Sequence, residues 1–352
     1  CLTDVDFFHG LTAIDAMAFS GCTGLTNIAF PPSLGTIGAA AFAQCGLARI
    51  EISSNVVSIG AGAFHSCAQL AEIDVSADNA GYCSSNGVLY DKTLTRLEQC
   101  PATRSGAFAV PESVTNIAPY AFSSCLELSE VTIPGSVLGI GSYAFNQTGL
   151  THVFLHGDLV DLGTGVFRSC ANLTEIEVDG DNPAYRSIDG VLFDRAGSAL
   201  IQFPSGKSGN YAIPAGVLEI ESTAFAGSAQ LTAVSMPSSV TRIGTQAFSG
   251  CAELVSVSMT TGLVGIGDQA FEGCDHLTAV HLPDTVADIG LGAFRNCGRL
   301  EEIVLPDSVT HLGASAFAEC ASLCRISIPD GVTQIHQGTF DQCQHLQEVT
   351  FG

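Results

Sequence analysis

The sequence predicts a solenoid of the α/β class, built from about fifteen short stacked coils, and two periodic features lead to this prediction. Phenylalanine recurs at intervals of 22 or 23 residues, for example at Phe248, Phe271 and Phe294, and only two intervals of 58 residues break the rhythm. In ten of the repeats a cysteine follows the phenylalanine by three positions. A constant period of this length is typical of architectures in which each unit packs only against its neighbours.

Each repeat also contains one short run of alternating apolar and polar residues, which predicts a strand. In Leu254–Met259, for example, Val257 and Met259 lie two residues apart and therefore point to one face. The sequence predicts fifteen such strands. Their last apolar residues are Phe7, Phe30, Ile52, Val75, Val110, Ile133, Leu155, Val178, Ile213, Met236, Met259, Leu282, Leu305, Ile328 and Phe351.

The length of the repeat limits what else it can hold. A right-handed βαβ unit needs about 30 residues or more, so a tighter coil is required. The repeat contains a strand, a turn often opened by proline, an Ile-Gly step such as Ile243-Gly244, a helical turn carrying Ala-Phe, and a return through Cys and Leu. This order fits a leucine-rich-repeat coil. Stacking would place the strands in one parallel, concave sheet, with short helical turns on the other side.

The recurrence of phenylalanine and cysteine is explained by packing. Each coil must fill the same position in a continuous interior, and a stack of phenyl rings beside a row of small buried thiols would do so. Where the cysteine is missing, Thr148 and Ser228 take its place, and these residues have similar size but no thiol chemistry. The position therefore selects volume rather than reactivity.

Two longer coils, at about 76–110 and 179–213, account for the intervals of 58 residues. Residues 78–110 align with residues 181–213 at an offset of 103 residues, which indicates a duplicated block. Within each long coil, a Gly-Val-Leu-aromatic-Asp run at 87–91 or 190–194 precedes a second apolar run, at 97–100 or 200–203. Each pair of runs predicts an inserted, protruding β-hairpin.

These patterns closely resemble the BspA-like leucine-rich repeats, a family of surface proteins from anaerobic bacteria, treponemes and parasitic protists. The motif V-x-x-I-G-x-x-A-F-x-x-C-x-x-L-x-x-V-x-I-P is matched nearly in full from Val309 to Pro329. The family's N-P-x-Y…D-G-V-L-F variant is present at 182–193, but in the first long coil Ala80 and Asn86 replace its proline and aspartate. The resemblance covers essentially all of residues 1–352 as a single solenoid domain. It implies a surface adhesin or host-interaction protein, and it names no partner.

The two ends of the chain predict a fragment of a longer protein. Residues 1–7 align with the second half of a coil, and the chain stops at a predicted strand, with no polar cap at either end. Cys1 could alternatively be a lipid-anchored cysteine, although such a residue usually precedes a flexible tether rather than a repeat.

Composition excludes several classes of function. The 352 residues carry 35 acids and 12 bases, a net charge of −23, and such a surface repels nucleic acid. No apolar run approaches the about 20 residues that a membrane-spanning helix needs. No basic region followed by an apolar one begins the chain, so any secretion signal was either removed or never present.

Motifs that could carry chemistry are better explained by the repeat. Gly139–Ala144 and Gly265–Ala270 match G-x-G-x-x-A, but they arise from the Ile-Gly and Ala-Phe steps and no βαβ unit surrounds them. Ser205–Ser208 resembles the end of a phosphate-binding loop, yet Ile201 occupies the position of its first glycine. There is no G-x-S-x-G and no H-E-x-x-H motif, so we expect no enzyme activity and no cofactor.

Disulfides and metal sites are also poorly supported. Cysteines in stacked coils would have parallel side chains about 4.8 Å apart, which does not suit a bridge. Cys83 and Cys100 share a hairpin and are the better pair, with their facing unknown. Cys320 and Cys324 are the nearest approach to a zinc motif, and Asp179–Asn182 could bind calcium or simply form a turn. We predict no metal site.

The outward strand positions suggest where a partner could bind. In the first half of the chain these positions form an acidic strip on the concave sheet, made of Asp4, Asp6, Glu51, Glu72, Asp74, Glu130, Glu175 and Glu177. The strip could be a docking surface for a basic partner or for divalent cations, or merely a solvated face that keeps the protein soluble.

The sequence therefore predicts a non-enzymatic binding or adhesion module at the cell surface or in the extracellular space. Its partner would be a protein or glycoprotein of a host or neighbouring cell, extracellular-matrix proteins among them, bound through the concave sheet and the hairpins. The alternative is a structural spacer that presents another domain.

Overall fold

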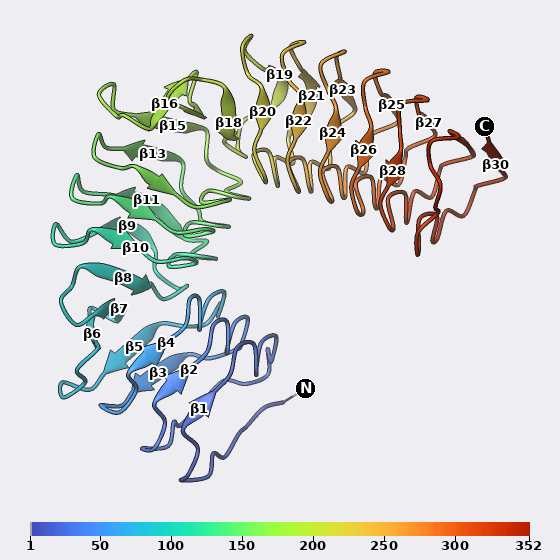
Figure 1. Ribbon diagram of the computed structural model, residues 1–352. Coiled ribbons are helices and arrows are strands. Elements are labelled where there is room, and N and C mark those ends of the chain that lie inside the picture. The colour runs from blue at the N-terminus through green and yellow to red at the C-terminus, as the bar shows by residue number, and fades with distance from the viewer. Residues whose placement is uncertain (1) are drawn as a thin grey trace. The chain divides into compact units, whose positions relative to one another are not determined.

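The computed structural model describes residues 2–352, which form two compact units, each a stack of coils (Figure 1). Unit 1 extends to Cys170 and includes Val178–Ala184, and unit 2 comprises Ala171–Glu177 and Tyr185–Gly352. The hypothesis of a lipid anchor on Cys1 lies outside the described residues. The described residues contain no helix that could span a membrane.

Most regular coils contain two strands rather than the one predicted. The long strands follow the Cys-Leu return, and they form parallel pairs with the long strands of neighbouring coils. They are β3 (Arg49–Ile52), β5 (Glu72–Val75), β9 (Gly106–Ala109), β11 (Leu128–Thr132), β13 (His152–Leu155), β15 (Glu175–Val178), β19 (Gly209–Ala212), β21 (Leu231–Ser235), β23 (Ser256–Ser258), β25 (Ala279–His281), β27 (Glu302–Val304), β29 (Arg325–Ile328) and β30 (Glu348–Phe351).

These long strands confirm thirteen of the fifteen predicted runs, and the runs ending at Phe7 and Phe30 form no strand. The second kind of strand is two residues long and lies at the Ile-Gly step. The short strands are β1 (Ala13–Ile14), β2 (Thr36–Ile37), β4 (Ser58–Ile59), β10 (Asn116–Ile117), β12 (Gly139–Ile140), β14 (Asp161–Leu162), β20 (Glu219–Ile220), β22 (Arg242–Ile243), β24 (Gly265–Ile266), β26 (Asp288–Ile289) and β28 (His311–Leu312).

The short strands, although only two residues long, are divided among hydrogen-bonded sheets of three, six and eight strands. The eight-stranded sheet lies in unit 2 and ends with the run β20, β22, β24, β26 and β28. The glycine that follows most of these strands is required by close approach between coils. A Cβ added to Gly163 would lie 2.2 Å from the Ser142 nitrogen, and one added to Gly267 would lie 2.7 Å from the Thr245 nitrogen. Only glycine allows the backbones to stack this closely.

The short helical turns predicted around Ala-Phe are wrong, since residues 2–352 contain no helix. Residues two positions before and after each phenylalanine have positive φ, as Gln246 (55°) and Gly250 (72°) do beside Phe248. Alternate N–H groups also leave the coil. The Phe248 nitrogen donates to the Ala270 carbonyl at 2.7 Å, whereas that of Ser249 bonds within the turn to Gln246 at 3.1 Å. A helix needs negative φ and internal hydrogen bonds throughout, so a run of tight turns forms instead.

The core of each unit confirms the predicted stack of phenyl rings. Phe248, Phe271 and Phe294 are fully buried, and their successive ring centroids are 5.0 and 5.3 Å apart with nearly parallel planes. Inward valine, isoleucine and leucine side chains from both kinds of strand complete the core.

The two long coils contain the predicted antiparallel pairs, together with a third strand. β6 (Tyr82–Ser85), β7 (Val88–Asp91) and β8 (Arg96–Gln99) form one antiparallel meander, and β16 (Tyr185–Ile188), β17 (Val191–Asp194) and β18 (Ala199–Gln202) form the other. The hairpins do not protrude, because Val88, Leu89 and Tyr90 are buried and β8 pairs with the short strand β10. Each meander therefore packs within the stack of coils and does not extend from its surface.

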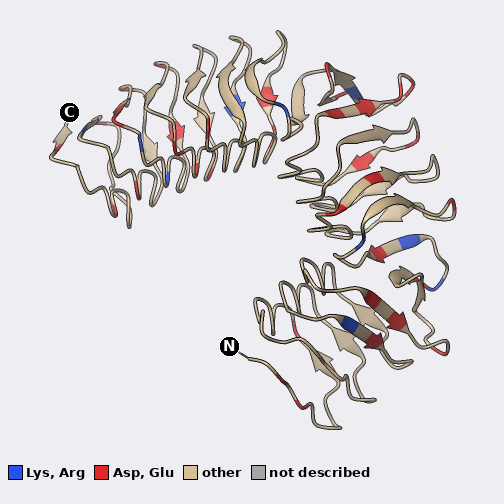
Figure 2. Cartoon of the chain, turned by 180° about the vertical axis from the view of Figure 1, so that it is seen from behind, with Lys and Arg blue, Asp and Glu red and all other residues tan. Residues whose placement is uncertain are grey.

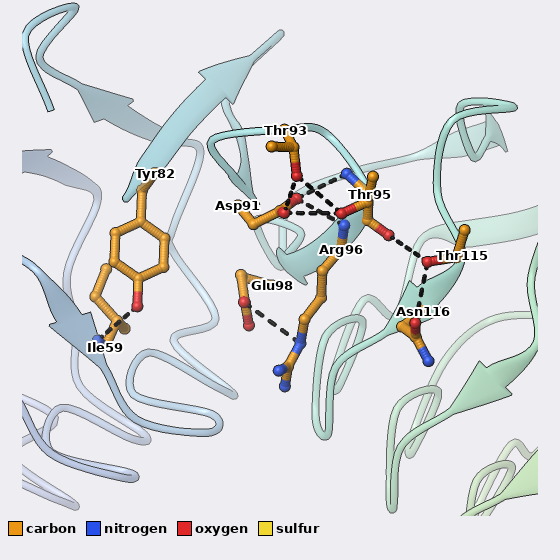
Figure 3. Close-up of polar contacts among 9 residues, drawn as sticks. All are labelled: Ile59, Tyr82, Asp91, Thr93, Thr95, Arg96, Glu98, Thr115 and Asn116. Carbon is orange, nitrogen blue, oxygen red and sulfur yellow. Dashed lines mark hydrogen bonds and ion pairs between the residues drawn. The ribbon is translucent and has the colours of Figure 1, made fainter. Parts of the chain in front are cut away.

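Polar side chains hold the turns of the first meander together (Figure 3). The Asp91 carboxylate accepts hydrogen bonds from the backbone nitrogens of Thr95 and Arg96, both at 2.7 Å, and from the hydroxyls of Thr93 and Thr95. Burial opposes its ionisation, but these bonds outweigh burial and lower the Asp91 pKa. Tyr82 accepts the Ile59 N–H at 2.8 Å, at the edge of the sheet that ends with β4.

Candidate binding face of the long strands

The outward side chains of the long strands differ from coil to coil, whereas the inward ones hardly change. The central inward positions repeat isoleucine or valine, as at Ile50, Ile73, Val131 and Val153, and all of these are buried. The outward positions hold acids, bases, hydroxyls, alanine, histidine and one aromatic residue. The inward positions are constant because every coil must fill the same core. The outward positions are not restricted by the core, so they can serve a function such as binding.

Two neighbouring strands near the N-terminus carry acidic residues, and one of them also holds a basic residue (Figure 2). On β3 that basic residue is Arg49, which lies among three acids of the strip. Its guanidinium is 3.6 Å from Glu51, 3.5 Å from Glu72, and hydrogen-bonded to Asp74. β3 and β5 pair in register, with Arg49 opposite Glu72 and Glu51 opposite Asp74, which brings the four groups together. The groups are 40 to 79% exposed, so these ion pairs contribute little to stability. One arginine therefore partly neutralises three of the predicted acids.

The other predicted acids do not join this cluster. Asp4 and Asp6 are exposed in a segment that forms no strand. Glu130 is exposed on β11, and Glu175 and Glu177 are exposed on β15. The uncharged strand β9 separates β5 from β11 along the chain. The predicted acidic strip is therefore a series of local groups.

A hollow of about 470 Å³ lies on the outward face of β11 and β13 in unit 1. Its lining includes Glu130, Thr132, His152, Phe154 and His156. Phe154 is 38% exposed, and its ring meets that of His156 edge to face at 4.9 Å. Phe154 was not predicted as a site residue. The sequence His152-Val153-Phe154-Leu155 could have identified it. Side chains alternate between the two faces of a strand, so Phe154 must point to the solvent side if Val153 and Leu155 are buried.

In unit 2 the outward positions of β19, β21, β23 and β25 hold no lysine, arginine, aspartate or glutamate. A hollow of about 590 Å³ over β19, β21, β23 and β25 is lined by Ala233, Ser235, Ser256, Ser258 and their neighbours. Further along, Glu302, Cys324 and Arg325 line a hollow of about 510 Å³. The outward charges of the second half, at Glu302, Arg325 and Glu348, lie on β27, β29 and β30.

The ten cysteines that follow a repeat phenylalanine by three positions are here called the ladder cysteines. They form no disulfide, and most of them make a hydrogen bond that was not predicted. Thiols of successive coils donate to the phenylalanine carbonyl of the preceding coil, as Cys274 does to Phe248 at 3.3 Å and Cys297 does to Phe271 at 3.2 Å. Thr148 differs, because its hydroxyl donates to the carbonyl of Phe145 in its own coil at 3.0 Å. The hydroxyl of Ser228 is buried without a hydrogen-bond partner, so the position selects volume first.

Cys83, Cys100 and Cys324, which do not belong to the ladder, also form no disulfide. β7 lies between β6 and β8, so it separates Cys83 from the strand that precedes Cys100. Cys320 is buried while Cys324 is exposed, and they do not form the beginning of a zinc site.

Burial should make the ladder thiols inert, because it raises the pKa of Cys251 and Cys320 to about 12. We expect iodoacetamide at pH 8 to label Cys324 at least a hundredfold faster than Cys297 in the native protein, and both alike in denaturant. Peptide mapping by mass spectrometry would measure the two rates. Equal labelling rates for Cys324 and Cys297 in the native protein would show that the coils around the buried thiols open readily to the reagent.

The possible calcium site at Asp179–Asn182 is a turn. Asn182 is fully buried, and its amide nitrogen donates to the carbonyls of His156 and Leu159, both at 2.9 Å. Its carbonyl oxygen accepts the Ala184 N–H at 2.9 Å. Asp179 accepts the Asp181 N–H at 3.0 Å. The Asp179 carboxylate and the Asn182 side-chain oxygen bond nearby backbone, as in Asx turns, whereas the Asn182 amide nitrogen bonds the preceding coil.

Comparison with known proteins gives consistent results. The model of the "BspA type Leucine rich repeat region" matches the chain in six copies, over residues 1–105, 98–212, 202–323 and 264–352. A leucine-rich cell surface protein from Faecalibacterium prausnitzii has a similar solved structure, with 27% identity and a TM-score of 0.61, and the match covers 87% of this chain and 79% of that one. The pneumococcal vaccine antigen PcpA shares the fold, with 22% identity, a TM-score of 0.66 and coverage of 96% and 79%. No curated protein matches.

Proposed function

The chain belongs to the BspA-type leucine-rich-repeat family, and we propose that it is a non-enzymatic binding module displayed at the cell surface or secreted. Its partner would be a protein or glycoprotein of a host or neighbouring cell. The family and the cell surface protein from Faecalibacterium prausnitzii support the general class, a protein-interaction module. Adhesion and host recognition are our proposal.

One observation carries this proposal: the outward positions of the long strands vary while the inward positions repeat. A spacer would need only a solvated surface there. Instead the face presents separate local groups, namely the Arg49 cluster, the hollow around Phe154, and the neutral hollow over β19 to β25. Binding sites in solenoids are commonly built on such extended surfaces.

Replacing Glu130, Glu175 and Glu177 by lysine tests the acidic part of this surface. The Arg49 cluster stays intact in this variant, so the fold of β3 and β5 is undisturbed. A matched control changes Glu112, Asp158 and Asp181, which are exposed in turns, to lysine and alters the net charge equally. Both proteins and the wild type would be applied to arrays of matrix proteins, mucins and glycans at 20 and 150 mM salt.

We expect a salt-sensitive partner whose affinity falls at least tenfold in the strand variant and less than twofold in the control. Equal losses of affinity in both variants would show that binding depends on the net charge of the protein and not on the acidic strip. The absence of any partner for the wild type would favour the spacer.

A further inference from the structure

We propose that the hollow on β11 and β13 binds an arginine side chain of a protein partner. This inference rests on the proposed function, and it names the chemistry that one part of the binding face recognises. The hollow holds the one aromatic side chain at an outward position of a described long strand, Phe154, beside an acidic side chain, Glu130.

The geometry of the two groups suits a guanidinium. Phe154 presents an exposed ring, and its edge-to-face contact with His156 holds that ring in place. Glu130 is exposed on the neighbouring strand, and within residues 2–352 it makes no ion pair. A planar guanidinium can stack on an aromatic face and also donate two parallel hydrogen bonds to a carboxylate.

Hydroxyl groups around the hollow complete the set of acceptors. Ser129, Thr132 and Thr151 line it together with Glu130, and a guanidinium has five N–H donors to satisfy. A volume of about 470 Å³ is ample for one arginine side chain and part of the segment that carries it. The net charge of −23 would also attract a basic segment from a distance.

The protein already uses this arrangement internally. The Arg104 guanidinium lies over the Phe108 ring, 5.7 Å from its centroid, and donates to the Asn86 carbonyl at 2.6 Å. In unit 1 an arginine on a phenyl ring with an oxygen acceptor beside it is therefore a stable local structure. Phe154 and Glu130 offer the same two components to an arginine from outside.

The test uses a fluorescent six-residue arginine peptide and its citrulline counterpart, which has nearly the same shape and no charge. Fluorescence anisotropy at pH 8 and 150 mM salt would measure their affinities. The variants are Phe154→Leu, which keeps an apolar side chain, and Glu130→Gln. The control is Glu348→Gln, which removes one exposed charge from an outward position of β30.

We expect Phe154→Leu and Glu130→Gln each to weaken binding of the arginine peptide about fivefold to tenfold. Glu348→Gln should weaken it less than twofold, and the citrulline peptide should bind all four proteins weakly and alike. Thermal unfolding would confirm that the variants fold. If Phe154→Leu or Glu130→Gln bound as Glu348→Gln does, the inference would be overturned.

The outcome separates this inference from the proposed function. A macromolecular partner that binds wild type and Phe154→Leu equally would support the binding module and reject the arginine site. Loss of peptide binding without any macromolecular partner would support the site and reject the module. The arginine peptide could bind all proteins alike while one glycan fails to bind only Phe154→Leu. This outcome would overturn the arginine site and show that the hollow binds a sugar.

Discussion

Raising the pH from 8 to 10 under reducing conditions is expected to destabilise the protein strongly, because the buried ladder thiols ionise only in the unfolded chain. Burial raises the pKa of Cys170 to about 11 and those of Cys67, Cys251 and Cys320 to about 12, from an ordinary value of 9.0. The hydrogen bond with Cys100 is the largest cause that raises the pKa of Cys125, followed by burial, and burial chiefly raises the pKa values of Cys274 and Cys297.

The sign follows from linkage between ionisation and folding. Each folded pKa lies above its unfolded value, so the contribution to stability is complete below pH 9 and is lost as the pH rises towards 11 or 12. At pH 10 an unfolded thiol with a pKa of 9.0 is favoured by about 1.4 kcal/mol over one that must stay protonated. For the four thiols with a folded pKa of about 11 or 12 the loss is about 6 kcal/mol, which is a large part of the stability of a typical domain.

Urea unfolding followed by circular dichroism at pH 7.5, 9 and 10 would measure this loss. The matched variant changes Cys251, Cys274 and Cys297 to serine, the residue that the chain itself has at Ser228. The variant should be less stable at pH 7.5 but should lose stability with pH more gradually, because three titrating groups are gone. An identical pH dependence in the two proteins would show that the thiols are not responsible.

Most of the fold could be predicted because it depends on repeated apolar positions. The spacing of Phe248, Phe271 and Phe294 indicated both the period and the stacked rings. The helical turns could not be excluded, since Ala-Phe steps have no periodicity that separates a turn from a short helix. The deciding feature is backbone hydrogen bonding to the next coil, as from Phe248 to Ala270, and it exists only once the coils are stacked.

The candidate site was harder to predict, because it depends on which side chains meet. Alternation placed Glu51, Glu72 and Asp74 on the outward face, and the structure places them there. The pairing of all three with Arg49 depends on the register between β3 and β5, which a single sequence does not specify. The hollow at Phe154 likewise requires two strands together. Counting charges favoured the acids and overlooked the aromatic residue between them.

Replacing Asn182 by alanine is expected to lower the free energy of unfolding by about 3 kcal/mol. The buried amide satisfies the carbonyls of His156 and Leu159 and the Ala184 N–H, none of which gains a new partner when the amide is removed. A buried polar group that loses its partner costs about 1 to 3 kcal/mol, and the groups share one small site, so the costs do not simply add.

Asn79 provides an internal replicate, because it occupies the equivalent position in the first copy of the duplicated block. Its amide nitrogen donates to Ser53 and Val56, at 2.7 and 2.9 Å, and its oxygen accepts the N–H groups of Gly81 and Tyr82. Urea unfolding of Asn79→Ala, Asn182→Ala and the exposed control Asn172→Ala would compare the three. We expect a similar large loss for the first two and less than 0.5 kcal/mol for the control. If Asn182→Ala behaved as the control does, the asparagine would be only a turn former. A large loss would make it the polar anchor on which the long coil is built.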